Sequence, residues 1–590
     1  MKISAFVVLC LATALPAQTS YLPGPESEPQ PGVPKGVVTR YELPPGRFYP
    51  GTPHSYAVYV PAKYDATKPA PFMVFFDGNG ALGGMRVPVV FDNLIAKGDL
   101  PPLIGIFVEP GVLPALSEQA QNRYERIFEY DSVSGRYARF LIEELIPAVG
   151  AKYNLSANPD DHALSGNSTG AVGAFVAAWH RPDQFHRVLS IIGTFVDMKG
   201  AEELASLVRK TEPKPIRIHL QVGKNDHIVP GQPWGTFYAG SWPINNQVMY
   251  DALSFAGYDA KFVVGEGAHD SKHATAMMPD ALRWLWADHP KPITVHEPAT
   301  TSEPGYDPRG RVYSIFSATK PWEPVGGPFK SIASLAADKD GFVFFSDSSD
   351  RRIYRADPDG KVTLFMEGTA GTTALKMAPD GRLLAAQPAR HQIVSYGPTG
   401  DEKSVAQDVM VHDLAVTATG RIYFTTPGQP TVSTIEPNGS VRVVFKLGEN
   451  STAAGLALSP DQAMLVVSDG RERHGWSLQI APDGSLRNGE PYYRLYVPEL
   501  VPGSTLDGVT MDSIGQVYFA SALGIQVTEQ NGRVAAVLNA PIFGAVEKIT
   551  FGGKELEFLY ATEGNRLFRR PVKIKGAAPW VVSKPPKPPL

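Results

Sequence analysis

The strongest constraint on the fold of this 590-residue chain is a pattern that recurs about every 40 residues in its second half. Each unit places a turn before a short run rich in β-branched and aromatic residues. Asp340-Gly341 precedes Phe342–Ser346, for example, and Thr419-Gly420 precedes Arg421–Thr425. Six such units can be counted, and repeats of this length are typical of propeller blades with four strands each. We therefore expect a six-bladed β-propeller over residues 326–575.

The first half of the chain has a different rhythm. Short apolar runs such as Phe72–Phe76, Leu103–Val108 and Ile216–Val222 predict buried strands, and stretches with helical spacing of apolar residues lie between them. Strands that alternate with helices predict a mostly parallel sheet with helices on both faces. We assign this α/β domain to residues 51–290, and a polar, proline-rich linker to residues 291–325.

The two ends of the chain have compositions of their own. Residues 1–17 combine Lys2, the apolar run Ile3–Leu15 and small residues up to Ala17, a pattern typical of a signal peptide. Residues 18–50 are rich in proline and glycine and predict an extended lead-in. The proline-rich residues 576–590 predict a disordered tail. We therefore expect an exported protein, periplasmic or extracellular.

Charge and cysteine content exclude several classes of function. The net charge is −4 and no long basic run occurs, so no nucleic-acid partner is expected. The only cysteine, Cys10, lies in the predicted signal peptide. Its removal would exclude disulfides, thiolate catalysis and cysteine-based zinc sites. No later segment is apolar and long enough for an integral membrane protein, and nothing in the sequence indicates an oligomeric state.

One pentapeptide in the α/β domain points to chemistry. Gly166-Asn167-Ser168-Thr169-Gly170 fits the pattern G-x-S-x-G, between a strand-like segment and the helical segment Ala171–Trp179. This strand–turn–helix arrangement exposes a serine hydroxyl at the carboxyl end of a sheet, where the helix N-terminus stabilises negative charge. Ser168 is therefore a candidate nucleophile. The alternative is a turn with a structural role alone.

An acid and a base follow Ser168 in the order that such a site requires. Asp226 comes just after the strand-like run Ile216–Val222, and His269 comes after a later one. Asp270 is a weaker candidate for the acid because it adjoins the histidine. His273 is the alternative base, but a loop position directly after a strand favours His269.

Backbone donors and a substrate pocket complete the candidate site. An oxyanion needs two N–H donors, which we assign to Thr169 and to Gly78, with Asn79 as the alternative, in the loop after Phe72–Phe76. Four residues near the predicted site are candidates for the substrate pocket, although the aromatic ones could equally belong to the core: Asn79, Trp234, Tyr238 and Trp242.

Residues 45–290 resemble the enterochelin-esterase and feruloyl-esterase group of α/β-hydrolases. The resemblance rests on five segments: 71–78, 129–131, 166–170, 223–226 and 267–270. It implies a catalytic triad of Ser168, Asp226 and His269, no cofactor, and a small-molecule or saccharide-linked ester as substrate. Gly267-Ala268 replaces the two glycines that often precede the histidine in this group. The group includes enzymes for siderophore, hydroxycinnamoyl and acetyl esters, so the resemblance alone does not identify the ester.

The second half resembles the SMP-30 and gluconolactonase group through residues 414–425, 455–461 and 506–512. This resemblance implies one calcium-like divalent cation, held in the central channel by a Glu, two Asn and an Asp. Asp507 matches the Asp, but Ala333, His412 and Ala454 stand at the other positions, with Asp413 nearby. Because a hard cation needs more oxygen ligands than these, we expect an accessory propeller rather than a metal-dependent enzyme.

Three functional hypotheses follow. The first is an exported serine carboxylic-ester hydrolase that acts on feruloyl, acetyl-sugar or siderophore-type esters. The second is a metal-dependent lactonase centred on Asp507 in the propeller. The third is a binding protein with an inactive hydrolase domain.

Overall fold

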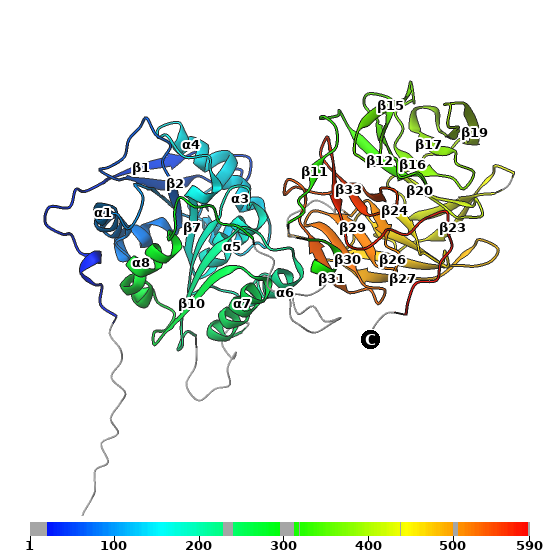
Figure 1. Ribbon diagram of the computed structural model, residues 1–590. Helices are drawn as coiled ribbons and strands as arrows, with labels where there is room; N and C mark the ends of the chain where they lie inside the picture. The colour runs from blue at the N-terminus through cyan, green and yellow to red at the C-terminus, as the bar shows by residue number, and fades with distance from the viewer. Residues whose placement is uncertain are drawn as a thin grey trace, which may run out of the picture.

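A computed structural model describes residues 21–227, 240–295, 312–317, 319–436, 438–499 and 506–587. The chain forms an N-terminal α/β domain and a C-terminal β-propeller, which lie side by side (Figure 1). The predicted signal peptide lies outside the described residues. None of the helices in the described ranges combines the length and the apolar character needed to cross a bilayer.

The α/β domain is built on one eight-stranded sheet in the order β1-β2-β4-β3-β7-β8-β9-β10. Strands β1 and β2 pair antiparallel with each other, β2 pairs antiparallel with β4, and the remaining pairs are parallel. This confirms the predicted mostly parallel sheet. Strand β1 lies in the expected lead-in, so the sheet begins before residue 51. The bounds are β1 Val37–Leu43, β2 His54–Val60, β3 Phe72–Phe76, β4 Ile104–Val108, β7 His162–Asn167, β8 Arg187–Ile191, β9 Arg217–Gly223 and β10 Asp259–Gly265.

Helices cover both faces of this sheet because the side chains of each strand alternate between them. Met73 and Phe75 of β3 pack with α1 and α8, whereas Phe72, Val74 and Phe76 pack with α3 to α7 on the other face. The central strands are therefore buried along their whole length. The helices are α1 Val87–Lys97, α2 Arg126–Tyr130, α3 Arg136–Phe140, α4 Ile146–Gly150, α5 Thr169–His180, α6 Glu203–Lys210, α7 Trp242–Ala256 and α8 Lys272–Leu285.

The second domain consists of six four-stranded sheets, which confirms the predicted six-bladed propeller. Five blades use four consecutive strands each. They are β12 Ile332–Ala337 to β15 Val362–Glu367, β16 Ala374–Met377 to β19 Glu402–Gln407, β20 Asp413–Val416 to β23 Val441–Lys446, β24 Ala453–Leu458 to β27 Leu486–Arg494, and β28 Val509–Met511 to β31 Val534–Leu538.

The sixth blade closes the ring by joining the two ends of the domain. Strand β11 (Glu323–Pro324) pairs with β34 (Arg566–Pro571), beside β33 (Phe558–Glu563) and β32 (Ile549–Gly552). Helix α9 (Val312–Ile315) packs into the core of the propeller just before β11. Both α9 and β11 lie within the residues that we expected to be a linker, so the propeller starts earlier than residue 326.

The end of the chain differs from the expected disordered tail. Residues 576–587 lie along the propeller, where the N–H of Ala577 donates to the carbonyl of Met511 at 2.9 Å. The N–H of Ser583 donates to the carbonyl of Pro460 at 2.9 Å. Ala578 and Trp580 pack against a hydrophobic cluster of the propeller. Backbone hydrogen bonds and the packing of two half-buried side chains thus hold part of a segment whose proline content predicts disorder.

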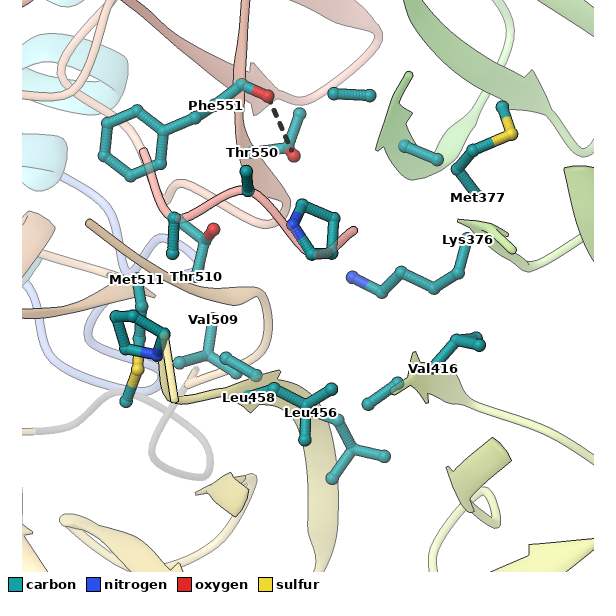
Figure 2. Close-up of a pocket in the computed structure, with 18 of the residues that line it drawn as sticks. Lys376, Met377, Val416, Leu456, Leu458, Val509, Thr510, Met511, Thr550 and Phe551 are labelled. Carbon is teal, nitrogen blue, oxygen red and sulfur yellow. Dashed lines mark hydrogen bonds between the residues drawn. The ribbon is translucent and has the colours of Figure 1, made fainter. Parts of the chain in front are cut away.

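A cavity of about 100 Å³ lies where the innermost strands of the six blades end, and the tail closes part of it. Its lining is mainly small or apolar, with one charged side chain, Lys376, which extends from β16 into the cavity (Figure 2). Residues 577–579 contribute to one wall. No histidine or carboxylate is among the described residues that line it, so the cavity offers no acid–base pair for catalysis.

Direct contacts join the two domains next to α6. The N–H of Glu212 donates to the carbonyl of Val537 in β31 at 2.9 Å. The carboxylate of Glu212 accepts hydrogen bonds from both terminal nitrogens of Arg570 at 3.0 and 2.9 Å. Lys210 donates to the hydroxyl of Tyr496 at 2.9 Å. The propeller is therefore docked on the α/β domain through polar pairs as well as through the connecting chain.

Candidate active site

Ser168 occupies a sharp turn between β7 and α5. Its backbone has φ 57° and ψ −120°, a conformation that costs free energy for a residue other than glycine. A Cβ atom on Gly166 would lie 2.1 Å from the carbonyl oxygen of Gly170, so only glycine fits there. The N–H of Ser168 donates to Ile191 at 2.9 Å, and its carbonyl accepts from Thr194 at 3.2 Å. These bonds hold the hydroxyl at the carboxyl edge of the sheet.

The structure brings Ser168, His269 and Asp226 into one row. Nε2 of His269 lies 3.0 Å from Oγ of Ser168, and its Nδ1 lies 2.8 Å from Oδ1 of Asp226. Asp226 follows β9 and His269 follows β10, and both strands run parallel to β7. The carboxyl ends of parallel strands meet at one edge of a sheet, so residues 101 positions apart come into contact.

The two alternative residues lie elsewhere. Nδ1 of His273 is 2.9 Å from the side-chain amide of Gln221, which donates to it, and its ring packs 4.3 Å from the ring of Tyr21. Burial lowers the pKa of His273. The carboxylate of Asp270 accepts a hydrogen bond from the N–H of Lys272 at 3.0 Å. Of the predicted bases, His269 is the one in contact with Ser168.

Thr194 and Trp242 form the wall beside the serine. The hydroxyls of Thr194 and Ser168 lie 3.0 Å apart, and the indole N–H of Trp242 donates to Thr194 at 3.3 Å. The Trp242 ring is buried and lies 5.6 Å from the His269 ring, nearly perpendicular to it. Trp242 therefore lies beside His269, and its burial fits the core position that was the alternative to a pocket residue. Thr194 was missed. The other two predicted aromatic pocket residues, Trp234 and Tyr238, lie outside the described residues.

Arg126 connects the loop after β3 to the serine turn. It donates to both carboxylate oxygens of Asp77 at 2.7 Å each and to the hydroxyl of Thr169 at 2.6 Å. Burial opposes the charge on Arg126, but the hydrogen bonds and charge of Asp77 raise its pKa above the ordinary value. Sequence reasoning missed Arg126, because its position at the start of α2 carries no motif.

The same loop carries Gly78 and Asn79, the two candidates for the second backbone donor. Gly78 approaches β4 so closely that an added Cβ would lie 2.5 Å from the carbonyl carbon of Phe107. The N–H of Asn79 donates to Glu109 at 2.5 Å, and its side-chain oxygen accepts from Arg40 at 2.9 Å. Asn79 is therefore engaged in other contacts, which leaves Gly78 as the better candidate donor beside Thr169.

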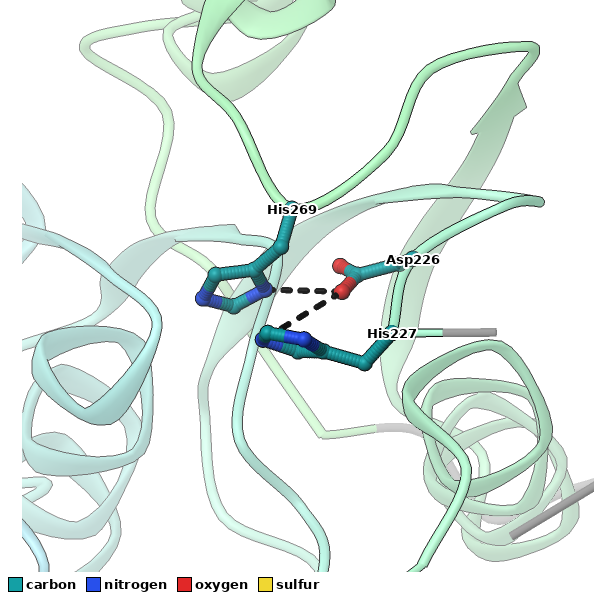
Figure 3. A group of neighbouring side chains, drawn as sticks. All are labelled: Asp226, His227 and His269. Atoms are coloured by element: carbon teal, nitrogen blue, oxygen red, sulfur yellow. Dashed lines mark hydrogen bonds and ion pairs between the residues drawn. The ribbon is translucent and has the colours of Figure 1, made fainter. Parts of the chain in front are cut away.

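His227 is a further histidine at this site. Its Nε2 lies 3.9 Å from Oδ1 of Asp226, the oxygen that also contacts His269 (Figure 3). The His227 ring lies 4.1 Å from the His269 ring and 4.4 Å from Trp242. Burial, and then the charge of His269, lower the pKa of His227.

The predicted propeller site is built differently from a cation site. Oδ1 of Asp507 lies 2.7 Å from the ammonium of Lys548 and 2.9 Å from Nε2 of His412. Although burial opposes it, these neighbours hold the pKa of Asp507 well below its usual range. Asp413 accepts a hydrogen bond from the N–H of Leu456 at 2.8 Å.

These contacts do not fit the divalent cation that the resemblance implies. A hard cation takes six to eight oxygen ligands. Here an ammonium group contacts the one matching carboxylate, and Ala454 offers no side-chain oxygen.

The fold and the site define an α/β-hydrolase domain followed by a six-bladed propeller. Residues 49–285 match the family described as "Putative esterase", and residues 333–565 match the SMP-30/Gluconolactonase/LRE-like region. The chain therefore joins a domain that matches the esterase family model to a propeller that matches the SMP-30/gluconolactonase-like model. Both resemblances inferred from the sequence are confirmed.

Each domain also has curated relatives. The chain is 23% identical to the iron(III) enterobactin esterase of Dickeya dadantii over 243 residues, which are 39% of this chain and 50% of the relative. It is 23% identical to the gluconolactonase of Zymomonas mobilis over 290 residues, 41% of this chain and 79% of the relative. The chain thus spans about half the length of the enterobactin esterase.

Solved structures resemble each domain separately. The enterobactin esterase FES from Shigella flexneri aligns with a TM-score of 0.34 and 19% identity, over 43% of this chain and 61% of that one. The gluconolactonase XC5397 from Xanthomonas campestris aligns with a TM-score of 0.39 and 22% identity, over 44% and 91%.

Proposed function

We propose that this protein is a serine carboxylic-ester hydrolase that works through an acyl-enzyme. The observation that carries the proposal is the row of Ser168, His269 and Asp226, with contacts of 3.0 and 2.8 Å, on a strained turn at the carboxyl edge of the sheet. A nucleophile next to a base that is oriented by a carboxylate is the arrangement that acyl transfer requires.

Each residue of the row has one role in this mechanism. His269 takes the proton of Ser168 through Nε2 as the serine oxygen attacks the ester carbonyl, and returns it to the leaving alcohol. Asp226 keeps the other ring proton on Nδ1 and stabilises the imidazolium. Water then attacks the acyl-enzyme by the same route and releases the carboxylic acid.

The negative charge of the tetrahedral intermediate needs donors that are already in place. In this proposal the backbone N–H groups of Gly78 and Thr169 supply them. Arg126 does not contact the reacting atoms but fixes both segments, because it binds Asp77 beside Gly78 and the side chain of Thr169. The positive end of α5 adds to the stabilisation.

We infer a small-molecule or saccharide-linked ester of the feruloyl, acetyl-sugar or siderophore type as the substrate. The curated relative named iron(III) enterobactin esterase supports this class. The signal-like residues 1–17 support export to the periplasm or beyond. The esterase reaction needs no cofactor, and the propeller acts as an accessory domain.

The test compares the full chain with its Ser168→Ala variant on a chromogenic ester and on acetyl, feruloyl and siderophore esters. We expect hydrolysis by the first and none by the second, and labelling of Ser168 by a fluorophosphonate. Equal activity in both proteins would refute the proposal. Lactone hydrolysis that survives Ser168→Ala but is lost with a chelator or Asp507→Ala would favour a metal-dependent lactonase. A folded protein that resists the fluorophosphonate would favour a binding protein.

A further inference from the structure

Two histidines converge on one carboxylate oxygen at the candidate active site. Oδ1 of Asp226 lies 2.8 Å from Nδ1 of His269 and 3.9 Å from Nε2 of His227 (Figure 3). One ligand atom from each of the three residues lies within 4.8 Å of the others. Within the described residues, no other group of three histidine, cysteine or acidic side chains is placed to hold a metal ion.

A second, independent feature of the site is Oδ2, the other carboxylate oxygen of Asp226. Asp226 is fully buried, and among the described residues no hydrogen-bond partner contacts its Oδ2. Burying an unpartnered charged oxygen costs free energy, which a cation at this carboxylate would offset.

His227 has no role in the acyl-transfer mechanism, yet its backbone is held in the left-handed region. Its φ is 47°, which is unfavourable for a residue other than glycine. This conformation, together with the contact between the tilted His227 and His269 rings at 4.1 Å, directs the imidazole toward Asp226. The strain is therefore associated with the position of a nitrogen ligand.

The ligand types select the metal. Two imidazole nitrogens and one carboxylate oxygen, with water in the fourth position, form a set that zinc binds in a tetrahedral arrangement. Calcium and magnesium prefer oxygen ligands alone. Ligand atoms around zinc lie roughly 3.3 Å apart, given bonds of about 2.0–2.1 Å. Small side-chain rotations of His227 and His269 would bring the three atoms to that spacing.

We propose that Asp226, His227 and His269 form an inhibitory site for Zn²⁺. This inference rests on the proposed esterase function. Zinc on Nδ1 of His269 uses the lone pair of that nitrogen, so the ring proton moves to Nε2. A protonated Nε2 cannot accept the proton of Ser168, and Asp226 is withdrawn from its role beside His269. The zinc-bound protein is therefore inactive, and a chelator restores it.

Binding is measured first, on a protein that cannot turn over. Full-length Ser168→Ala protein, freed of metal with a chelator, is titrated with ZnCl₂ in a calorimeter. We expect one Zn²⁺ per chain and no binding heat with MgCl₂. His227→Phe in the same background keeps an aromatic ring against His269 but removes the nitrogen ligand, and should weaken zinc binding at least tenfold. His227→Gln repeats the test with a polar side chain, and His273→Gln is the matched control that keeps zinc affinity.

Inhibition is measured second, on ester hydrolysis. Zinc should inhibit the wild-type protein reversibly, and His227→Phe should need at least tenfold more zinc for the same inhibition. Thermal unfolding of each variant shows whether it is folded. Absence of zinc binding, zinc affinity unchanged in folded His227→Phe and His227→Gln, or activation by zinc would overturn the proposal.

The two proposals can fail separately. If the wild-type protein hydrolyses no ester but zinc binding depends on His227, the esterase function and the inhibition fail while the metal site stands. If hydrolysis depends on Ser168 and zinc does not bind, the metal site fails and the esterase function stands.

Discussion

Arg126 binds both carboxylate oxygens of Asp77 at 2.7 Å, in a two-pronged pair that aligns the loop after β3 with the serine turn. A planar guanidinium can make this pair and still reach the hydroxyl of Thr169 at 2.6 Å. Lysine cannot, because its ammonium is a single point of charge. The pair therefore links the two segments that carry the proposed oxyanion donors.

We expect Arg126→Lys to lower kcat for ester hydrolysis by about 10- to 100-fold with little change in KM, because misplaced donors weaken transition-state binding alone. Steady-state kinetics on a chromogenic ester measure this. Arg123→Lys, at an exposed arginine that pairs with Glu125, is the matched control and should change neither constant. A rise in KM without a fall in kcat would instead indicate that Arg126 contacts the substrate.

The contact between His269 and Asp226 leads to a prediction about additivity. Asp226→Asn should lower kcat by about 10³-fold or more, because an amide no longer keeps the ring proton on Nδ1. Combined with Ser168→Ala, it should cause no further loss, since the residues act as one unit. Activities of the two single variants and the double variant test this. Losses that multiply would show that Asp226 acts independently of the serine.

The main features of both domains could be predicted from local patterns. Buried apolar runs indicate strands, and glycine at positions 166 and 170 allows the turn that exposes Ser168. Ser168, Asp226 and His269 each follow a strand of the parallel part of the sheet, so all three lie at its carboxyl edge. Local spacing was sufficient here because the ends of parallel strands define the site.

The missed residues depend on contacts between distant segments. Arg126 reaches Asp77 from 49 residues away, and Lys548 reaches Asp507 from 41 residues away in the next blade. Neither position has a repeat or motif that would indicate its partner. The tail was mispredicted for a related reason, because its contacts with Met511 and Pro460 exist only after the propeller has closed.

The pair of Glu212 and Arg570 predicts how strongly the domains are coupled. Arg570 is 3% exposed and Glu212 is 13% exposed, so removing either partner leaves a buried charge. Glu212→Gln and Arg570→Gln should each cost about 3–5 kcal/mol of unfolding free energy. The double variant should cost less than the sum.

Chemical denaturation of the four proteins completes this cycle. The pair of Arg494 and Glu203, which also joins the domains but is 55% and 48% exposed, is the matched control and should contribute at most about 1 kcal/mol. Additive costs for Glu212 and Arg570 would contradict the coupling.

The buried lysine Lys214 should make the free energy of unfolding depend on pH. Burial lowers its pKa from 10.5 to about 7, against the opposing charges of Glu212 and Asp183. Between pH 7 and 10.5 the unfolded chain holds a proton that the folded chain lacks, so this lysine makes stability rise with pH across that window. Below pH 7 Lys214 is protonated in both the folded and the unfolded chain, so the full cost of burying its charge is present.

Lys214→Met should therefore stabilise the protein by about 1–3 kcal/mol at pH 7, with a gain that shrinks toward pH 10. This range allows for the attraction between the ammonium and the Trp179 ring at 4.2 Å. Denaturation curves at several pH values measure the effect. Lys68→Met, at a lysine that is 80% exposed, should show none, and a gain independent of pH would refute the role of the charge.

Lys548 predicts that the propeller does not depend on calcium. Its ammonium contacts Asp507 at 2.7 Å, in the position where a cation would otherwise balance that carboxylate. Millimolar CaCl₂ should leave the Tm of the wild-type protein unchanged relative to EDTA, because a ligand stabilises only a fold that binds it. Lys548→Met should lower the unfolding free energy by about 1–3 kcal/mol, since among the described side chains Asp507 then retains only His412. Lys446→Met, at an exposed lysine of β23, is the control and should have no effect. A calcium-dependent rise of several degrees in the wild-type protein would show instead that the channel binds the cation despite its ligand set.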